Sequence, residues 1–203
     1  MLKAPQQKRS EETLQRILEV CEQLIDQGRF EQASMQEIAR DAGVSVGTLY
    51  KRFSAKAAIV DYLVDRLQTQ QYSRLLAELT SSTADRLDDR VRYLSDVLYR
   101  SNAEFAGLLR TVMVTHLLGS SPLSETTSSR SAGLITEMAA WLDQSEDSPD
   151  LDVCQQAVAI MAFAFQYRAI YPTPDALLGA EVYREVICEM TRKYLLDLDK
   201  TAP

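Results

Sequence analysis

Apolar residues recur every three or four positions along most of the chain, which is the spacing of one buried face of an α-helix. The first such stripe predicts a helix that ends near Gly28. Its apolar members are Leu14, Ile17, Leu18, Cys21, Leu24 and Ile25. Residues 1–9 are polar, and we expect them to be frayed.

Serine residues mark where three further helices begin. Ser34, with Glu37 three residues later, has the pattern of a capping box and predicts the start of a second helix. Ser45 predicts the N-terminus of a third, short helix. Ser54 precedes a long fourth helix, which we expect to reach about residue 71 or beyond.

The rest of the chain repeats the same helical spacing, interrupted by short polar breaks. We predict helices at about 86–101, 103–118, 124–145, 151–170 and 174–198. The alternation typical of strands is absent, and no fixed repeat is visible. The expected fold class is therefore all-α.

Composition supports this expectation. Of 203 residues, 46% are hydrophobic and 25% charged, with only seven glycines and six prolines to interrupt helices. The longest apolar run, 157–165, has nine residues, against the roughly 20 that cross a bilayer. Three cysteines in apolar patterns suggest buried thiols in a reducing compartment. We expect a cytoplasmic protein with no membrane span, metal or cofactor.

The charge of the chain is unevenly distributed. The net charge of −7 argues at first against a nucleic-acid partner, because binding to phosphates requires Lys and Arg. Residues 1–56, however, carry nine Lys or Arg and eight Asp or Glu, whereas residues 57–203 carry 13 and 21. The excess of acidic residues therefore lies in the C-terminal part.

The segment from residue 34 to 59 has the spacing that a helix-turn-helix requires. Ala39 is small enough for the next helix to cross closely, and Gly43 permits the turn between them. Ile38, Val44 and Leu49 can fill the angle between the two helices, which leaves the other side of the third helix free to enter a major groove. That outer side consists of Val46, Gly47, Thr48, Tyr50, Lys51 and Arg52.

These residues resemble the N-terminal signature of the TetR family of transcriptional regulators. The matching positions are Ile38-Ala39, Ala42-Gly43-Val44-Ser45, Gly47-Thr48-Leu49-Tyr50, Phe53 and Lys56. The family often has an acidic residue after the lysine, where this chain has Ala57. The resemblance implies a three-helix DNA-binding domain at 1–56, followed at 57–203 by a helical bundle for ligand binding and dimerisation.

The resemblance also implies roles for individual residues. Those implied to contact DNA phosphates are Ser34, Ser45, Thr48, Tyr50 and Lys56. Gly47 is implied to let the backbone approach DNA closely.

The side-chain chemistry of three more residues, considered without the resemblance, also suits contacts with DNA. Lys51 and Arg52 are able to reach base edges or backbone, and Val46 a thymine methyl group. The alternative is that the serines are only caps, Tyr50 a half-buried surface aromatic, and the cations a solvated face.

In the family, the last two helices of two subunits form a four-helix bundle, and this chain has suitable residues for it. The segment 151–170 is rich in alanine, so that helices can approach closely. Along the last helix, apolar positions recur at Ala180, Tyr183, Ile187, Met190 and Tyr194. Packing within one subunit explains the same pattern. A single short reading helix recognises few bases, however, so paired half-sites favour a homodimer.

A small-molecule effector would bind inside the helices of the C-terminal part. The candidate contacts are Leu67, Val97, Phe105, Leu109, Met113, His116, Trp141, Phe163 and Tyr167. Each of these also fits a plain hydrophobic core.

The expected function is a ligand-responsive regulator, a repressor in the family's commoner mode, that binds palindromic double-stranded DNA as a homodimer and is released by a small molecule. An enzyme is not expected, because the sequence has one histidine and no phosphate-binding glycine loop, nucleophile elbow or metal-ligand spacing. The alternative keeps the fold and makes the protein a DNA-bound adaptor that recruits another protein without a ligand.

Overall fold

The computed structural model describes residues 4–118, 125–171 and 179–198, and at 4–7, 116–118, 125–128 and 197–198 it describes the backbone alone. The described residues form helices and no strand. The helices are α1 (Ala4–Asp26), α2 (Met35–Asp41), α3 (Val46–Arg52), α4 (Lys56–Ser81), α5 (Leu87–Glu104), α6 (Ala106–Val112), the π-helical η1 (Met113–Leu118), α7 (Glu125–Leu142), α8 (Leu151–Ile170) and α9 (Ala180–Leu198). The all-α prediction is confirmed.

Several element limits differ from the sequence-based expectation. The prediction that residues 1–9 are frayed is wrong from Ala4 onward, because α1 begins there, and residues 1–3 lie outside the described part. The expected helix at 103–118 is divided: α5 ends at Glu104, and α6 continues into η1. The first residues of the expected helix at 174–198 also lie outside the described part, and α9 is described from Ala180.

The N-terminal helices share one hydrophobic cluster. It joins α1, α2 and α3 to the first half of α4, where it extends as far as Val64. Its fully buried members are Ile17, Cys21, Ile38, Ala39, Leu49, Ile59 and Val60. The first two turns of α4 therefore complete the core beneath the short helices α2 and α3.

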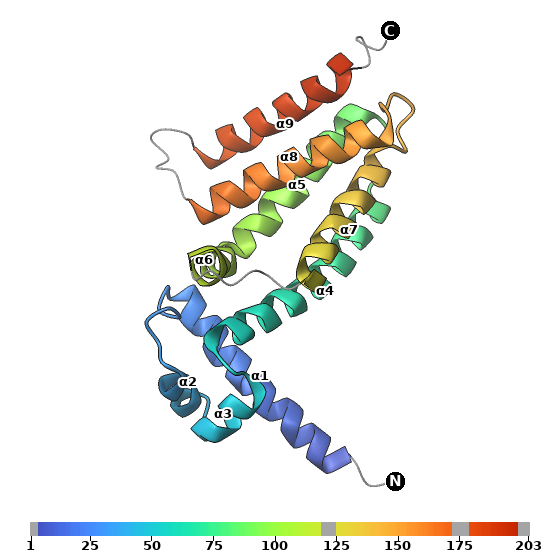
Figure 1. The fold of residues 1–203 in the computed structure, drawn as a ribbon. Coiled ribbons are helices and arrows are strands. Elements are labelled where there is room, and N and C mark those ends of the chain that lie inside the picture. Colours follow the sequence, from blue (N-terminus) through green and yellow to red (C-terminus); the bar gives the residue numbers. More distant parts are fainter. Residues whose placement is uncertain (1–3, 119–124, 172–178, 199–203) are drawn as a thin grey trace.

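A second hydrophobic cluster lies between the later helices. It contains residues of α5, α7, α8 and α9, together with the second half of α4. Figure 1 shows these helices as an elongated bundle, with α8 beside α9 and the N-terminal helices at the opposite end of the molecule. Arg90 stacks over the ring of Trp141 at 4.8 Å and so covers one side of this core. None of the described helices combines the length and the apolar character needed to cross a membrane.

Helix α6 connects the two halves of the molecule. It lies between the N-terminal helices and the bundle in Figure 1 and contacts both α1 and α8. At Gly107 the approach to α1 is close, because a Cβ atom there would lie 3.3 Å from Cγ2 of Ile25. Leu108 and Val112 pack on the N-terminal cluster. The position of α6 therefore depends on that of α1.

Candidate nucleic-acid interface

The start of α2 is fixed by a complete capping box. Oγ of Ser34 accepts a hydrogen bond from the backbone N–H of Glu37 at 3.2 Å, and the Glu37 carboxylate accepts one from the N–H of Ser34 at 2.8 Å. These bonds satisfy amides that a helix N-terminus otherwise leaves unpaired. The bonds to Ser34 hold the pKa of Glu37 below its usual value. Ser34 is thus exposed and already engaged as a cap, as its spacing to Glu37 predicted.

The turn between α2 and α3 depends on Gly43, whose φ of +63° lies in the left-handed region. Its N–H donates to the carbonyl of Arg40, and the next N–H, of Val44, donates to the carbonyl of Ala39 at 2.9 Å. This arrangement closes the end of α2 and is cheap only for glycine. The chain then enters α3 across the buried Ala39.

One side of α3 is fixed in the core and the other is exposed. Leu49 is fully buried and Phe53, just after the helix, is nearly so. On the opposite side Tyr50 is 48% exposed and Val46 36%. Lys51 is also exposed. The predicted outward side of this helix is therefore present in the structure.

Ser45 forms the N-cap of α3. Its Oγ accepts a hydrogen bond from the N–H of Thr48 at 3.1 Å and lies 2.8 Å from the Thr48 hydroxyl. The two hydroxyl groups are therefore held together at the exposed start of the helix.

Gly47 has no packing partner that would explain a glycine. A Cβ atom built there would have Oγ of Ser45 as its nearest neighbour, 4.0 Å away. The space above Gly47 is open within this chain, so the fold alone does not require glycine at this position.

Arg52 is directed toward α1. Its Nη2 donates to the carbonyl and to the hydroxyl of Ser10, each at 2.6 Å. The sequence placed Arg52 with the outward residues of α3, and its pairing with a residue 42 positions earlier had no sequence signal. In this structure Arg52 braces α3 against α1, and Lys51 is the exposed cation of the pair.

Lys56 is likewise bound within the chain. Its ammonium group donates to the carbonyls of Phe30 and Glu31, at 3.0 and 2.7 Å, and lies 5.3 Å from the centre of the Phe30 ring. An ammonium group has three donors, so one is left for a further partner. Lys56 holds the turn between α1 and α2 in place.

The candidate effector residues lie in different parts of the structure. Val97 and Trp141 lie in the bundle core, and Leu109 and Met113 are half-buried. Leu67 and Phe105 line a cavity of about 330 Å³ between α1, α4 and the junction of α5 with α6. The side chain of His116 lies outside the described residues.

Phe163 and Tyr167 do not lie inside the molecule, contrary to the sequence-based expectation. They are 65% and 62% exposed on α8, because the buried side of that helix is occupied by other residues, among them Met161 and Phe165. Helical spacing gives the residues that share a face and leaves open which face turns inward.

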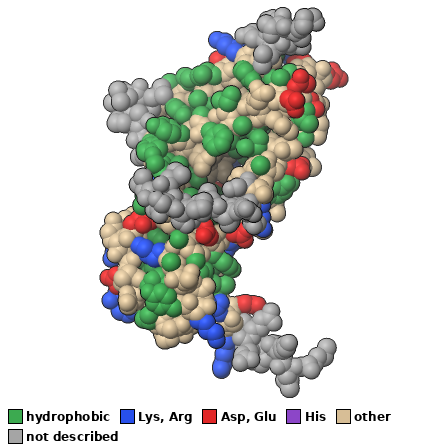
Figure 2. Space-filling model, viewed as in Figure 1, with side chains coloured by type: hydrophobic (Ala, Val, Ile, Leu, Met, Phe, Trp, Pro, Cys, Tyr) green, Lys and Arg blue, Asp and Glu red, His purple; other side chains and the backbone are tan. Residues whose placement is uncertain are grey.

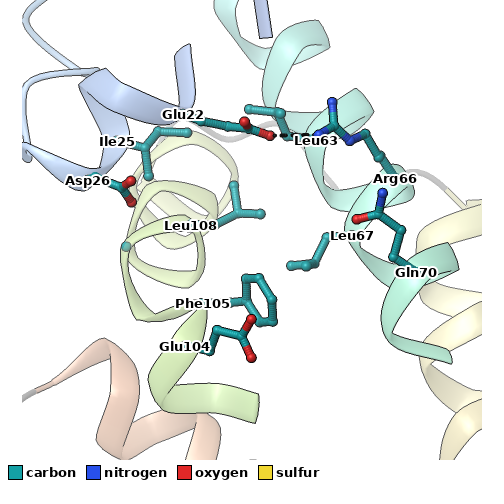
Figure 3. Close-up of a pocket in the computed structure, with 11 residues that line it drawn as sticks. Glu22, Ile25, Asp26, Leu63, Arg66, Leu67, Gln70, Glu104, Phe105 and Leu108 are labelled. Atoms are coloured by element: carbon teal, nitrogen blue, oxygen red, sulfur yellow. Dashed lines mark ion pairs between the residues drawn. The ribbon is translucent and has the colours of Figure 1, made fainter. Parts of the chain in front are cut away.

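The cavity near Leu67 is shown in Figure 3, where the side chains of Leu67, Phe105 and Leu108 converge from two sides. Its charged residues, Glu22, Asp26, Arg66 and Glu104, were missed by the sequence analysis. Only the spacing of four between Glu22 and Asp26, which places both on one side of α1, was available as a signal. Within the described part of the chain, no group of three or more His, Cys, Asp or Glu residues is placed to hold a metal ion.

Comparison with known proteins agrees with this geometry. Residues 17–63 match the family model described as bacterial regulatory proteins, tetR family. A helix-turn-helix transcriptional regulator of Staphylococcus aureus strain USA300 is 37% identical over 59 residues, which are 29% of this chain. The match spans 32% of the length of that relative.

Two solved structures have a similar overall fold. The fatty acid degradation regulator FadR from Bacillus halodurans superposes with a TM-score of 0.60 at 15% identity, over 88% of this chain and 97% of that one. The TetR family repressor AlkX from a Dietzia strain, implicated in biodegradation of n-alkanes, gives 0.54 at 16% identity, over 89% and 95%. At these identities the likeness concerns the fold.

A short helix with one side fixed in a core and the other exposed, after a glycine turn, defines the N-terminal part as a helix-turn-helix domain. Over residues 17–63 this domain is similar to the TetR family.

Proposed function

We propose that the protein is a transcriptional regulator that binds a palindromic DNA operator as a homodimer. The observation that carries the proposal is the exposed side of α3, held outward by the buried Leu49 beneath it. A helix presented in this way fits the major groove of B-DNA.

The exposed residues divide into two kinds of DNA contact. The hydroxyls of Ser45, Thr48 and Tyr50 suit phosphate oxygens, which position the protein on the duplex without reading sequence. Val46 and Lys51 suit base edges, the first a thymine methyl and the second guanine. The open space above Gly47 lets the backbone approach the DNA.

Ser34, Arg52 and Lys56 have smaller roles in this proposal, because each is already bonded within the chain. Lys56 retains one free donor for a phosphate. Its main part is to keep α2 and α3 in place.

Dimerisation is supported by two exposed apolar stripes in the C-terminal helices. On α8 and just after it, the stripe consists of Ile160, Phe163, Tyr167 and Tyr171. On α9 it consists of Val182, Val186 and Met190. Figure 2 shows hydrophobic side chains gathered on the face of the molecule over these helices. Large contiguous apolar patches on a soluble protein mark interaction surfaces, and a second copy of the chain would cover both stripes.

The same exposed stripes also fit the alternative, an adaptor that recruits a different protein to DNA. We favour the homodimer because one short reading helix recognises too few bases for specific binding, whereas two copies read two half-sites. Regulation by a small molecule and repression are further parts of the proposal, and AlkX, one of the two similar structures, is a repressor.

The proposal is tested by selecting bound fragments from random duplex DNA with the purified full chain. A palindrome with half-sites one helical turn apart is expected. Tyr50→Phe and Lys51→Gln are then compared with Arg100→Gln, an exposed cation on α5. The first two variants should weaken binding to the selected site while Arg100→Gln leaves it unchanged. Absence of any enriched sequence, or equal effects in all three variants, would refute the proposal.

A further inference from the structure

We propose that the first turns of α1 form a second DNA contact, in which Lys8 and Arg9 bind phosphates beyond the base pairs that α3 reads. The inference rests on the proposed function, because it extends the same complex with DNA. These turns project from the protein: among the described side chains of α1, Leu14 is the first that packs on the N-terminal cluster. Figure 1 shows this end of α1 extending past α2 and α3.

Two contacts show that α1 runs beside α3 in the opposite direction. Arg52, the last residue of α3, donates to the carbonyl and to the hydroxyl of Ser10. In the turn before α3, a Cβ atom built on Gly43 would lie 3.6 Å from Nη1 of Arg16. The start of α1 therefore continues past the C-terminal end of α3, along the line of the reading helix.

The projecting part is long enough to leave the groove that α3 occupies. Helix α1 begins at Ala4, six residues before Ser10, and at the helical rise this distance is about 9 Å. The major groove is about 12 Å wide and has a phosphate backbone along each edge. A helix that passes the end of α3 by this distance reaches the backbone at the edge of the groove. The bonds of Arg52 to Ser10 hold it there.

The charge of this end suits phosphates. Residues 1–9 carry three Lys or Arg and no Asp or Glu, whereas Glu11 and Glu12 follow on the side nearer the core. Lys8 and Arg9 are exposed and have no ion pair among the described residues. Carboxylates stabilise a helix N-terminus, and the first turn of α1 has none. The stability of the helix does not account for this charge, whereas attraction to DNA does.

The shape of the segment favours phosphates over the adjacent minor groove. Arginine side chains on extended arms do enter narrow minor grooves, which A·T pairs provide. Here the backbone is helical from Ala4 onward. A helix with its side chains is about 10–12 Å across, and the minor groove is only about 6 Å wide. The expected contact is therefore one of position and affinity, without reading of sequence.

The test uses the full chain and its selected operator, prepared with and without neutral methylphosphonates in place of the phosphates that border each half-site. The wild-type chain should bind the modified operator about tenfold more weakly. The double variant Lys8→Gln with Arg9→Gln should bind the normal operator about tenfold more weakly and lose nothing further on the modified one. Its salt slope should fall by about one for each cation removed. Arg100→Gln, on α5, should behave as the wild-type chain on both duplexes.

An equal loss on the modified operator in the wild-type chain and the double variant would overturn the inference. Weaker wild-type binding after replacement of bordering A·T pairs by G·C would also overturn it, because it would assign the contact to the minor groove. Both substituted residues are exposed, so the melting temperature should stay that of the wild-type chain. A wild-type chain that binds no operator loses the proposed function. One that binds its operator without any contribution from Lys8 and Arg9 loses only this inference.

Discussion

At the scale of single residues, a substitution at Gly47 should affect folding and the proposed DNA binding differently. The nearest atom to a built Cβ is 4.0 Å away, so alanine fits without a clash. Gly47→Ala should stabilise α3, by up to about 1 kcal/mol, because glycine is the poorer helix former. The same methyl group should obstruct the approach of DNA. The melting temperature of Gly47→Ala should therefore rise while its affinity for the operator falls. A rise in both quantities, or a fall in both, would contradict the assignment.

The three cysteines provide a second prediction at this scale. Burial raises the pKa of Cys21 to about 12 and also raises the pKa values of Cys154 and Cys188. Thiolate is the reactive form, so none of them should react with a thiol reagent at pH 8 until the chain unfolds. Because the folded pKa of Cys21 exceeds its unfolded value, its contribution to stability is complete below pH 9 and is lost as pH rises toward 12. Rapid labelling of the native protein would show that a thiol is accessible.

What the sequence could predict at this scale was local. Ser34 with Glu37 and the glycine at position 43 act within a few residues, and the structure confirms both. The bonds of Arg52 to Ser10 and of Lys56 to Phe30 join residues 42 and 26 positions apart, and no local pattern specifies them.

At the scale of elements, Lys56 tests how α2 and α3 are held. Lys56→Met keeps the aliphatic stem but removes the bonds to the carbonyls of Phe30 and Glu31. The free energy of unfolding should fall by about 1 kcal/mol, the usual net effect of losing hydrogen bonds to carbonyls that water still reaches. The salt dependence of DNA binding should change little, because two of the three donors already serve the fold. Lys51→Met, at an exposed position, is the matched variant. It should leave the free energy of unfolding unchanged. It should also reduce, by about one, the slope of the logarithm of the DNA-binding constant against the logarithm of the salt concentration.

The limits of the elements were predictable only where a cap or glycine marks them. Ser45 and Asp150 both accept a hydrogen bond from the amide three residues later, and α3 and α8 begin where these caps place them. The division near Phe105 has no such signal. The change from α6 to the π-helical η1 likewise has no local signal in the sequence.

At the scale of the whole molecule, the exposed stripes of α8 and α9 predict the oligomeric state. Phe163→Glu places a charge in the centre of the proposed dimer face and should produce monomers in sedimentation experiments, with loss of operator binding. Leu151→Glu is the control, because Leu151 is exposed at the first turn of α8, outside the stripe. A wild-type chain that already sediments as a monomer would favour the adaptor instead.

The sequence predicted an all-helical chain with two functional halves, but it misplaced Phe163 and Tyr167 in a pocket. Both residues have helical apolar spacing, which is the same for a core, a ligand site and a subunit interface. The cavity near Asp26 was missed because its walls come from α1, α4 and α6, which meet only in the folded molecule.

Helix α4 contributes to both hydrophobic clusters, and this determines which fragments of the chain can fold on their own. A truncated chain of residues 1–56 lacks Ile59, Val60, Leu63 and Val64, all of which fill the N-terminal core. It should give the circular dichroism of an unstructured peptide, whereas a longer fragment ending at Ser82 should be helical and melt cooperatively. Any fragment in which the helix-turn-helix stays folded therefore has to carry a helix that the C-terminal bundle also needs.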